Sequence, residues 1–389
     1  MRYTRTVTAV TESPLVQIAT LAESMPGAIK LCYGESDMPT PDFICRAADD
    51  AMRAGHTFYT NTAGYTELRA AIANKGRELH GVSYDASEIL CTVGATMAMY
   101  IAVRTHVGPG DNAIIVSPCY ALFDNAVTLS GGEPRPVPLV CDENTFSLDI
   151  DRIRARIDDR TRMIIVNSPS NPTGWMISEA EQRALYALAV EHDLVILSDE
   201  VYERLTFDVD IAPSFARIAD DRDHLIVVNS FSKTYNMTGW RLGWAQASAR
   251  AVKAMANAAE FITSNSAAMV QQAGIVALRD GESYVRDLRA SYASRRDRVV
   301  AAFREMPGVS LALPSGGFYA FARVDGLTDS ATFALDLLRE TGVALAPGSA
   351  FGAAGEGCIR LCFAASEPVL ADALDRIAGH IGALARVGG

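Results

Sequence analysis

The chain has 389 residues, of which 49% are hydrophobic and 21% charged, and its formal net charge is −11. This length favours two or three domains with a large buried core. The acidic balance and the absence of a basic run argue against nucleic acid or an acidic membrane surface as a partner.

The apolar runs and the cysteines indicate a cytoplasmic protein. No apolar run approaches the roughly 18 residues of a membrane span, and the first 15 residues contain no apolar segment typical of a secretory signal. The seven cysteines form no CxxC pair, so we expect mostly buried thiols in a reducing cytoplasm. The six histidines are scattered without metal-ligand spacing, and no metal site is expected.

From about residue 45 the chain alternates helical and strand patterns, which predicts βαβ units and a mainly parallel sheet. A helix is expected from Thr66, with Thr66 as its N-cap, and the segment from Ile89 reads as strand, glycine turn and helix. Short apolar runs begin at Ala113, Met163, Leu194 and Leu225, and their lack of alternation predicts strands buried on both faces. Ser178 and Glu181 form a capping box that opens a helix.

The pattern changes past residue 275 to long helices with hairpin-like pieces, "SGGFYAFARV" and "CIRLCFA". We therefore predict an α/β fold with a large domain over residues 45–275 and a smaller α+β domain over residues 276–389. Residues 1–44 are expected to form an N-terminal arm and part of the small domain.

Polar side chains cluster where three predicted strands end, at Ser168–Asn171, Ser198–Glu200 and Ser230–Lys233. The carboxyl ends of parallel strands face the ligand crevice of an open α/β sheet. We therefore expect these clusters to meet at one site.

Several common motifs are missing. The sequence contains no GxGxxG, no GxxxxGK[ST] and no GxSxG. Ser230 and Lys233 match the S-x-x-K pattern of acyl-serine enzymes, but the S-D-N and K-T-G elements that accompany it do not occur. Acyl-serine chemistry is therefore disfavoured.

Lys233 is one of only four lysines in a chain that otherwise uses arginine for positive charge. Arginine stays protonated, whereas a desolvated lysine amine can lose its proton and form a Schiff base with a carbonyl. A surface lysine is the alternative, although the position directly after a buried strand disfavours it.

The neighbours of Lys233 suggest a phosphate site. Arg241, Ser230 and Ser232 offer a guanidinium fork and two hydroxyls. The turn Gly94-Ala95-Thr96 would add N–H groups and the positive end of a helix dipole. An amine beside a phosphate cradle points to pyridoxal 5′-phosphate (PLP), and Asp199 is the candidate to keep its pyridine nitrogen protonated.

Three motifs in this order resemble those of the class I/II aminotransferases, which are fold type I PLP enzymes similar to aspartate aminotransferase. They are "NPTG" from Asn171, "SDEVY" from Ser198 and "SFSKTYNMTGWRLGW" from Ser230, and weaker pieces extend the resemblance over residues 30 to 365.

The resemblance implies a homodimer with shared active sites and a role for each matching residue. Lys233 would carry the Schiff base and move the proton, Asp199 would pair with the pyridine nitrogen, and Tyr202 and Asn171 would bind the phenolic oxygen. The remaining cofactor contacts would be Tyr120 stacking on the ring, Ser230, Ser232, Arg241, Ala95 and Thr96 on the phosphate, and Tyr59 on a phosphate of the partner subunit. Arg360 would bind the substrate α-carboxylate, with help from Asn171 and the Gly34 backbone.

Two departures from the family pattern leave the substrate open. Phe123 stands where the family often has tyrosine, and Met38 stands where it usually has phenylalanine, near the expected position of substrate side chains. We therefore predict a PLP-dependent aminotransferase that moves an amino group from an L-amino acid to a 2-oxo acid with ping-pong kinetics. A PLP-dependent lyase on the same scaffold is the alternative, and a PLP-sensing transcription regulator is disfavoured by the acidic charge.

Overall fold

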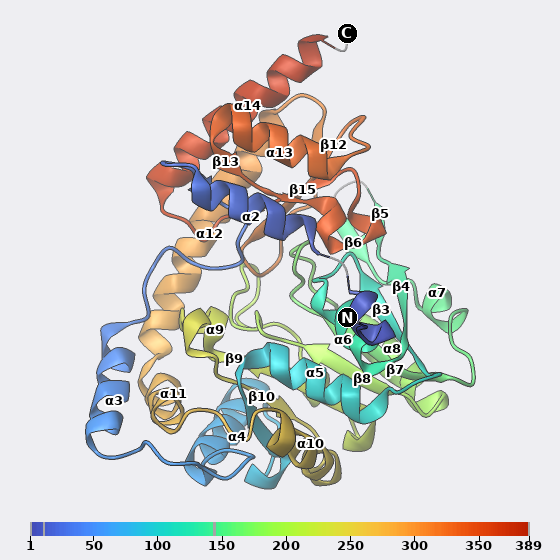
Figure 1. Cartoon of the computed structure of the whole chain (residues 1–389), viewed down its shortest axis with the longest axis vertical. Helices are drawn as coiled ribbons and strands as arrows, with labels where there is room; N and C mark the ends of the chain where they lie inside the picture. The colour runs from blue at the N-terminus through green and yellow to red at the C-terminus, as the bar shows by residue number, and fades with distance from the viewer. Residues whose placement is uncertain (1, 11, 143–144, 388–389) are drawn as a thin grey trace.

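The computed structural model describes residues 2–10, 12–142 and 145–387, and its largest feature is a seven-stranded sheet (Figure 1). The strands lie in the order β2 (Ile89–Thr92), β10 (Gly243–Gln246), β9 (Leu225–Ser230), β8 (Val195–Asp199), β7 (Thr161–Asn167), β3 (Asn112–Ser117) and β4 (Glu133–Pro138). Neighbours from β9 to β4 pair in parallel, and β10 is antiparallel to both β2 and β9. The predicted mainly parallel sheet is confirmed.

The central strands are buried on both faces, as their sequences predict. Ile114 and Ile164 belong to an apolar cluster on one side of the sheet, whereas Ile115 and Ile165 belong to a cluster on the other. Because both faces of these strands pack against apolar neighbours, side chains that point to either face are apolar. Apolar and polar residues therefore do not alternate along the strands.

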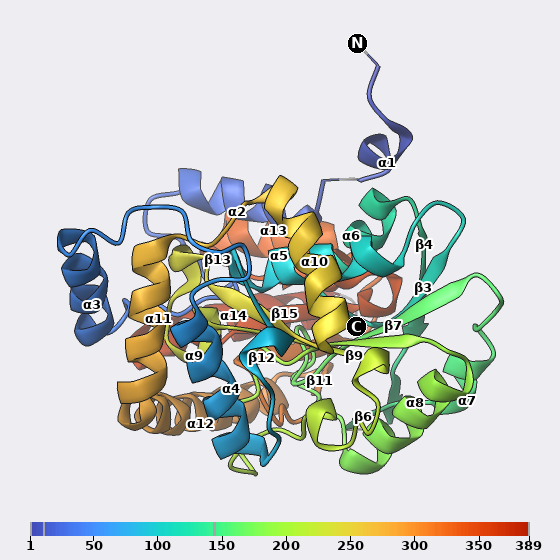
Figure 2. The same cartoon turned by 90° about the horizontal axis from the view of Figure 1, so that it is seen from below.

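Helices cover the two faces of this sheet (Figure 2). One face packs against α5 (Gly94–His106), α6 (Leu122–Ser130) and α10 (Ala249–Ile262). The other packs against α7 (Ile150–Arg154) and α8 (Glu179–Glu191), and α8 begins with the predicted reciprocal hydrogen bonds of Ser178 and Glu181. The predicted N-cap at Thr66 is wrong: α4 (Thr66–His80) has Tyr65 as its N-cap and Thr66 as its first helical residue, with no side-chain cap.

The C-terminal part forms a second sheet of four antiparallel strands. Its order is β11 (Val309–Leu311), β12 (Tyr319–Val324), β15 (Cys358–Cys362) and β14 (Ala346–Pro347). The predicted hairpin-like pieces are β12 and β15, which pair directly although α13 (Ser330–Thr341) and β14 lie between them in sequence. Helices α12 (Glu282–Glu305), α13 and α14 (Glu367–Val387) pack against the strands of this half. Helix α11 (Ala268–Asp280), which precedes them, belongs instead to the apolar cluster beside the large sheet.

The N-terminal segment packs on the C-terminal part of the chain. Helix α2 (Pro14–Ser24) buries Ile18 and Ala22 in a cluster with Leu338 and Phe351, and in Figure 1 it lies beside α13. Strand β1 (Ile29–Lys30) then pairs in parallel with β13 (Val343–Ala344). The short α1 (Arg5–Thr8) instead contacts α6.

The predicted domain boundaries fall within helices. Residues 44 and 45 lie in α3 (Asp42–Arg53), and residues 275 and 276 lie in α11, which packs on α3 and α4. The division of the chain into domains therefore stays a prediction. A short β5 (Val140–Asp142) and β6 (Thr145–Ser147) pair outside both large sheets. Within the described residues, no helix combines the length and apolar character needed to cross a bilayer.

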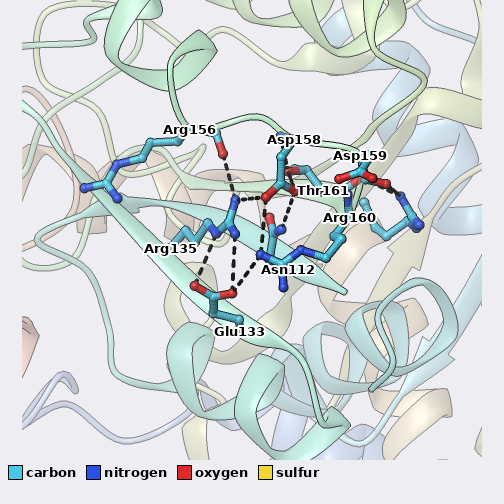
Figure 3. Close-up of polar contacts among 9 residues, drawn as sticks. Asn112, Glu133, Arg135, Arg156, Asp158, Asp159, Arg160 and Thr161 are labelled. Atoms are coloured by element: carbon cyan, nitrogen blue, oxygen red, sulfur yellow. Dashed lines mark hydrogen bonds and ion pairs between the residues drawn. The ribbon is translucent and has the colours of Figure 1, made fainter. Parts of the chain in front are cut away.

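A cluster of ionic contacts holds the amino ends of β3, β4 and β7 together (Figure 3). Arg135 donates to Asp158 at 2.8 Å and pairs with Glu133 at 3.3 Å, while Asn112 donates to Asp158 at 2.9 Å. Hydrogen bonds from Asn112 and Arg135 lower the pKa of Asp158, which keeps this carboxylate ionised. The polar residues at the amino ends of these strands thus pair with each other, whereas polar residues at the carboxyl ends of the sheet face a cavity.

Candidate active site

A cavity of about 510 Å³ opens at the carboxyl ends of β7, β8 and β9. All predicted site residues except Gly94 and Tyr59 line it: Gly34, Ala95, Thr96, Tyr120, Asn171, Asp199, Tyr202, Ser230, Ser232, Lys233, Arg241 and Arg360. The expectation that three strand ends meet at one site is therefore confirmed.

Lys233 lies in α9 (Phe231–Thr234), the single helical turn that follows β9. Ser230 caps this turn by accepting a hydrogen bond from the Ser232 N–H at 3.2 Å. The Lys233 amine donates to the Gly34 carbonyl at 2.5 Å. Burial lowers the pKa of Lys233 to about 8, so the neutral amine that can attack a carbonyl is far more populated near neutral pH than in an ordinary lysine.

Arg241 and Gly94 fit together where a phosphate is expected. Arg241 has a left-handed backbone conformation, with φ of 53°, and donates to the Thr238 carbonyl at 2.9 Å. Gly94 has φ of 76°, and a Cβ placed on it would collide with the Arg241 guanidinium. The glycine therefore lets the guanidinium lie against the N-terminus of α5, where two sources of positive potential favour one anion.

Asp199 is the last residue of β8 and accepts a hydrogen bond from the Val201 N–H at 3.2 Å. Burial raises the pKa of Asp199 to about 7, and the positive charge of Lys233 opposes that rise. A buried carboxylate with so few donors is suited to a cationic N–H partner.

Asn167 was missed by the sequence analysis, and it joins two predicted site residues. Its side chain donates to the Asp199 carbonyl at 3.0 Å and accepts from the Asn171 N–H at 2.7 Å. Asn167 ends β7 opposite Asp199 in the strand register, and that position at a strand end is the signal that could have identified it.

Tyr319 is a second missed residue, although it lies within the quoted "PSGGFYAF" piece. Its hydroxyl lies 2.8 Å from that of Tyr202, and burial raises the pKa of both phenols. A Cβ at Gly34 would collide with the Tyr319 hydroxyl, so glycine at that position permits the close approach. Both hydroxyls stay protonated, and because one donates to the other, the pair has one O–H left to donate at the cavity wall.

Arg360 lies in β15 and is only 2% exposed. One guanidinium nitrogen donates to the Asn171 side chain at 2.8 Å and another to the Cys32 carbonyl. Its Nε is buried without a partner among the described residues. A buried arginine with neutral partners and a spare donor is suited to bind a carboxylate.

The geometry agrees with three comparisons with known proteins. Residues 26–377 match the family model for aminotransferase class I and II. The chain is 35% identical over 388 residues to an aspartate aminotransferase of Bacillus subtilis, covering 97% of this chain and 98% of that protein. It is 36% identical to aromatic-amino-acid aminotransferase 2 of Thermococcus litoralis, covering 95% of each. A single mutant of the Thermus thermophilus aspartate aminotransferase superposes with a TM-score of 0.91 at 35% identity, covering 97% of this chain and 99% of that one. The chain belongs to the class I and II aminotransferases.

Enzymes of this aminotransferase family depend on pyridoxal phosphate, and the site fits that group. The fit rests on three features of the cavity: a buried lysine amine with a lowered pKa, a buried carboxyl group in the same cavity, and an arginine that lies against a glycine turn. These match the aldehyde, the pyridine nitrogen and the phosphate of the cofactor.

The remaining predicted residues lie at the edges of the aminotransferase site. Tyr120 lines the cavity with 43% of its surface exposed and meets the buried Phe123 edge-on, with ring centroids 6.5 Å apart. Tyr59 is 90% exposed and does not line the cavity. Met38 lines a neighbouring hollow with Ser36 and Trp240 and not this cavity, so its expected position beside the substrate side chain is not supported.

Proposed function

We propose that the protein transfers an amino group from an L-amino acid to a 2-oxo acid by a ping-pong reaction at this cavity. The observation that carries the proposal is the position of the Lys233 amine, with its lowered pKa, in the same cavity as Asp199 and Arg360. Related proteins are named for aspartate, aromatic amino acids and LL-diaminopimelate, so family membership alone leaves the donor open.

When bound, the cofactor supplies an aldehyde and an electron-withdrawing ring. Lys233 would bond to the aldehyde and, once displaced by substrate, would take the Cα proton and return it to the cofactor carbon. Asp199 would keep the pyridine nitrogen protonated, and Arg360 would fix the substrate carboxylate in a bidentate pair. Ser230, Ser232, Arg241 and the amides after Gly94 would hold the phosphate, and Tyr202 and Asn171 would bind the phenolic oxygen.

We also propose a cytoplasmic homodimer with shared active sites. The cytoplasmic location is supported by seven free cysteines, of which only Cys45 and Cys141 are exposed. Sharing of sites is supported by Tyr59 and Phe58, which are 90% and 80% exposed, because large aromatic side chains in such positions are typical of contacts with another protein.

A single-turnover experiment tests the reaction class. The holoenzyme mixed with an amino acid alone should lose its visible absorbance once, release one equivalent of 2-oxo acid and recover its absorbance when a different 2-oxo acid is added. A lyase would instead release pyruvate and ammonia on every turnover without an acceptor.

Lys233→Ala should lower kcat by about 10³-fold or more, because the base and the covalent anchor are both lost. Lys253→Ala is the matched control, since Lys253 is an exposed lysine on α10. Borohydride should fix the cofactor on the peptide that contains Lys233 in the holoenzyme. Fixation on another lysine, or normal turnover by Lys233→Ala, would contradict the assignment.

A further inference from the structure

The charged groups of the cavity leave one carboxylate without a role in binding the cofactor or the substrate α-carboxylate. Among the described residues that line it, the positive side chains are Lys233, Arg241 and Arg360, and each already has a proposed partner. The negative side chains are Asp199, at the end of β8, and Glu23, from the end of α2. The described lining that one chain supplies thus offers no spare cation for a second carboxylate of a substrate, and it offers a spare anion.

Helix α2 supplies an apolar wall that leads to Glu23. Leu15, Val16 and Ala19 line the cavity from the preceding turns of this helix. Ile18 and Ala22 on its other face are buried against the C-terminal half, which fixes the position of the helix. Pro14 at the first turn and the Ser13 side chain, which accepts from the Leu15 N–H at 3.3 Å, define where it begins.

The side chain of Glu23 is exposed at the cavity, where Tyr33 orients its carboxylate. Tyr33 adjoins Gly34, whose carbonyl accepts a hydrogen bond from Lys233. The Tyr33 hydroxyl donates to Glu23 at 2.7 Å. That hydrogen bond is the main cause that raises the pKa of Tyr33 to about 12, so the phenol stays a donor and the carboxylate an acceptor. No lysine, arginine or histidine forms an ion pair with Glu23 in the part of the chain that the structure describes.

The surroundings of Glu23 add negative charge. A second hollow shares Glu23, Tyr33, Gly34 and Lys233 with the active-site cavity. It is also lined by Glu35 and Asp37, against the single additional cation Lys30. The Glu35 and Asp37 side chains accept hydrogen bonds from Thr238 and the Ser366 N–H, which leave their charges in place. This potential attracts a cationic group and repels an anionic one.

We infer that the subsite for the substrate side chain selects an aliphatic chain that ends in a positive charge, as in L-lysine, L-ornithine or L-arginine, and disfavours dicarboxylic amino acids. The inference rests on the proposed aminotransferase function. With the α-carboxylate on Arg360 and the amino group toward Lys233, the aliphatic stem would lie along Leu15 and Ala19. Its cationic end would then reach Glu23, because long basic side chains pack their stems on apolar surface and place the charge at a polar rim.

The test compares donors of matched shape. For the holoenzyme with pyruvate as acceptor, kcat/KM for L-lysine should exceed that for its uncharged analogue L-norleucine by about 10-fold, as expected for one charge-assisted hydrogen bond. The ratio of kcat/KM for L-lysine to kcat/KM for L-glutamate should be larger still, because the side-chain carboxylate of glutamate would be repelled by Glu23.

Glu23→Gln should lower kcat/KM for L-lysine about 10-fold, mainly through KM, and should raise that for L-glutamate. The rate with L-norleucine should stay within about twofold, which shows that the variant is folded and loaded with cofactor. Glu12→Gln, an exposed acid before α2 that does not line the cavity, is the matched control. Tyr33→Phe should give a smaller loss in the same direction.

Two results would overturn the inference: a wild-type preference for L-norleucine or L-glutamate over L-lysine, or a Glu23→Gln effect that is equal for all three donors. The cofactor absorbance distinguishes failure of the side-chain inference from failure of the proposed aminotransferase function. If some donor bleaches the cofactor in one turnover but no preference for a cation appears, only the side-chain inference fails. If no donor bleaches it, the aminotransferase proposal fails.

Discussion

Asp199 shows how a single residue can favour function at the expense of stability. Burial raises its pKa to about 7, well above the ordinary 3.8. Between these values the cofactor-free folded state binds more protons than the unfolded state does. Stability from this group is therefore highest at low pH and falls as the pH rises from about 4 to about 7, and above that the full cost of burying the charge remains. A cationic pyridine N–H beside the carboxylate would offset this cost.

Asp199→Asn should therefore have opposite effects on the two properties. The cofactor-free variant should melt at a higher temperature than the cofactor-free wild type at pH 8, and the difference should shrink at pH 5.5, where both side chains are largely neutral. In the holoenzyme the same change should lower kcat by about 10²- to 10³-fold, because the amide cannot balance a positive ring. Melting curves at both pH values and steady-state rates check the two effects.

Asp220→Asn, which changes an exposed acid, should alter neither property and serves as the control. A cofactor-free Asp199→Asn variant that is less stable than wild type at pH 8 would contradict the assigned cost of burial. A normal rate would remove Asp199 from the site.

At the scale of elements, the phosphate cradle depends on the fit between the turn before α5 and the segment that carries Arg241. Gly94→Ala would place a methyl group in the space of the guanidinium and strain a backbone with φ of 76°. We expect the dissociation constant of the cofactor to rise by about 10-fold or more, as for loss of one charge-assisted contact. Fluorescence or absorbance titration of the cofactor-free protein measures it.

Gly379→Ala is the matched control for Gly94→Ala. Gly379 lies within α14, has no left-handed φ, and a Cβ there would meet no atom within 4 Å. This substitution should leave cofactor affinity unchanged and slightly stabilise the helix. If Gly94→Ala binds the cofactor as tightly as Gly379→Ala does, the guanidinium does not depend on this turn.

The elements also explain what could be predicted from the sequence. Lys233, Asp199 and Arg241 were predictable because strand ends, a capped turn and a local motif place the chemistry within short segments. Asn167 also ends a strand, but its contact with Asp199 depends on the register of β7 and β8, which the local sequence pattern does not give. Glu23 is an exposed acid on an amphipathic helix, and only the packing of α2 on the C-terminal half makes it line the cavity that holds Lys233. Contacts between distant segments depend on tertiary packing, which local sequence patterns do not specify.

At the scale of the whole molecule, Tyr59 is the predicted cofactor contact whose side chain lies outside the cavity of its own chain. It is 90% exposed and does not line the cavity, unlike every other predicted cofactor contact except Gly94. Gly94 acts through the space it leaves for Arg241, whereas Tyr59 has no comparable contact with the cavity of its own chain. A role for Tyr59 in cofactor binding therefore requires a second copy of the chain.

The dimer proposal predicts that Tyr59→Phe weakens cofactor binding in a protein that sediments at twice the chain mass of 41.7 kDa. Loss of one hydrogen bond to a phosphate should raise the cofactor dissociation constant by about 10-fold, because bonds to charged groups contribute about 1.5–3 kcal/mol. Tyr3→Phe, which removes the hydroxyl of another exposed tyrosine, should have no effect. Sedimentation velocity at micromolar concentration and a cofactor titration check both parts. A monomer that binds the cofactor with undiminished affinity after Tyr59→Phe would exclude shared sites, since the hydroxyl would then have no phosphate to bind.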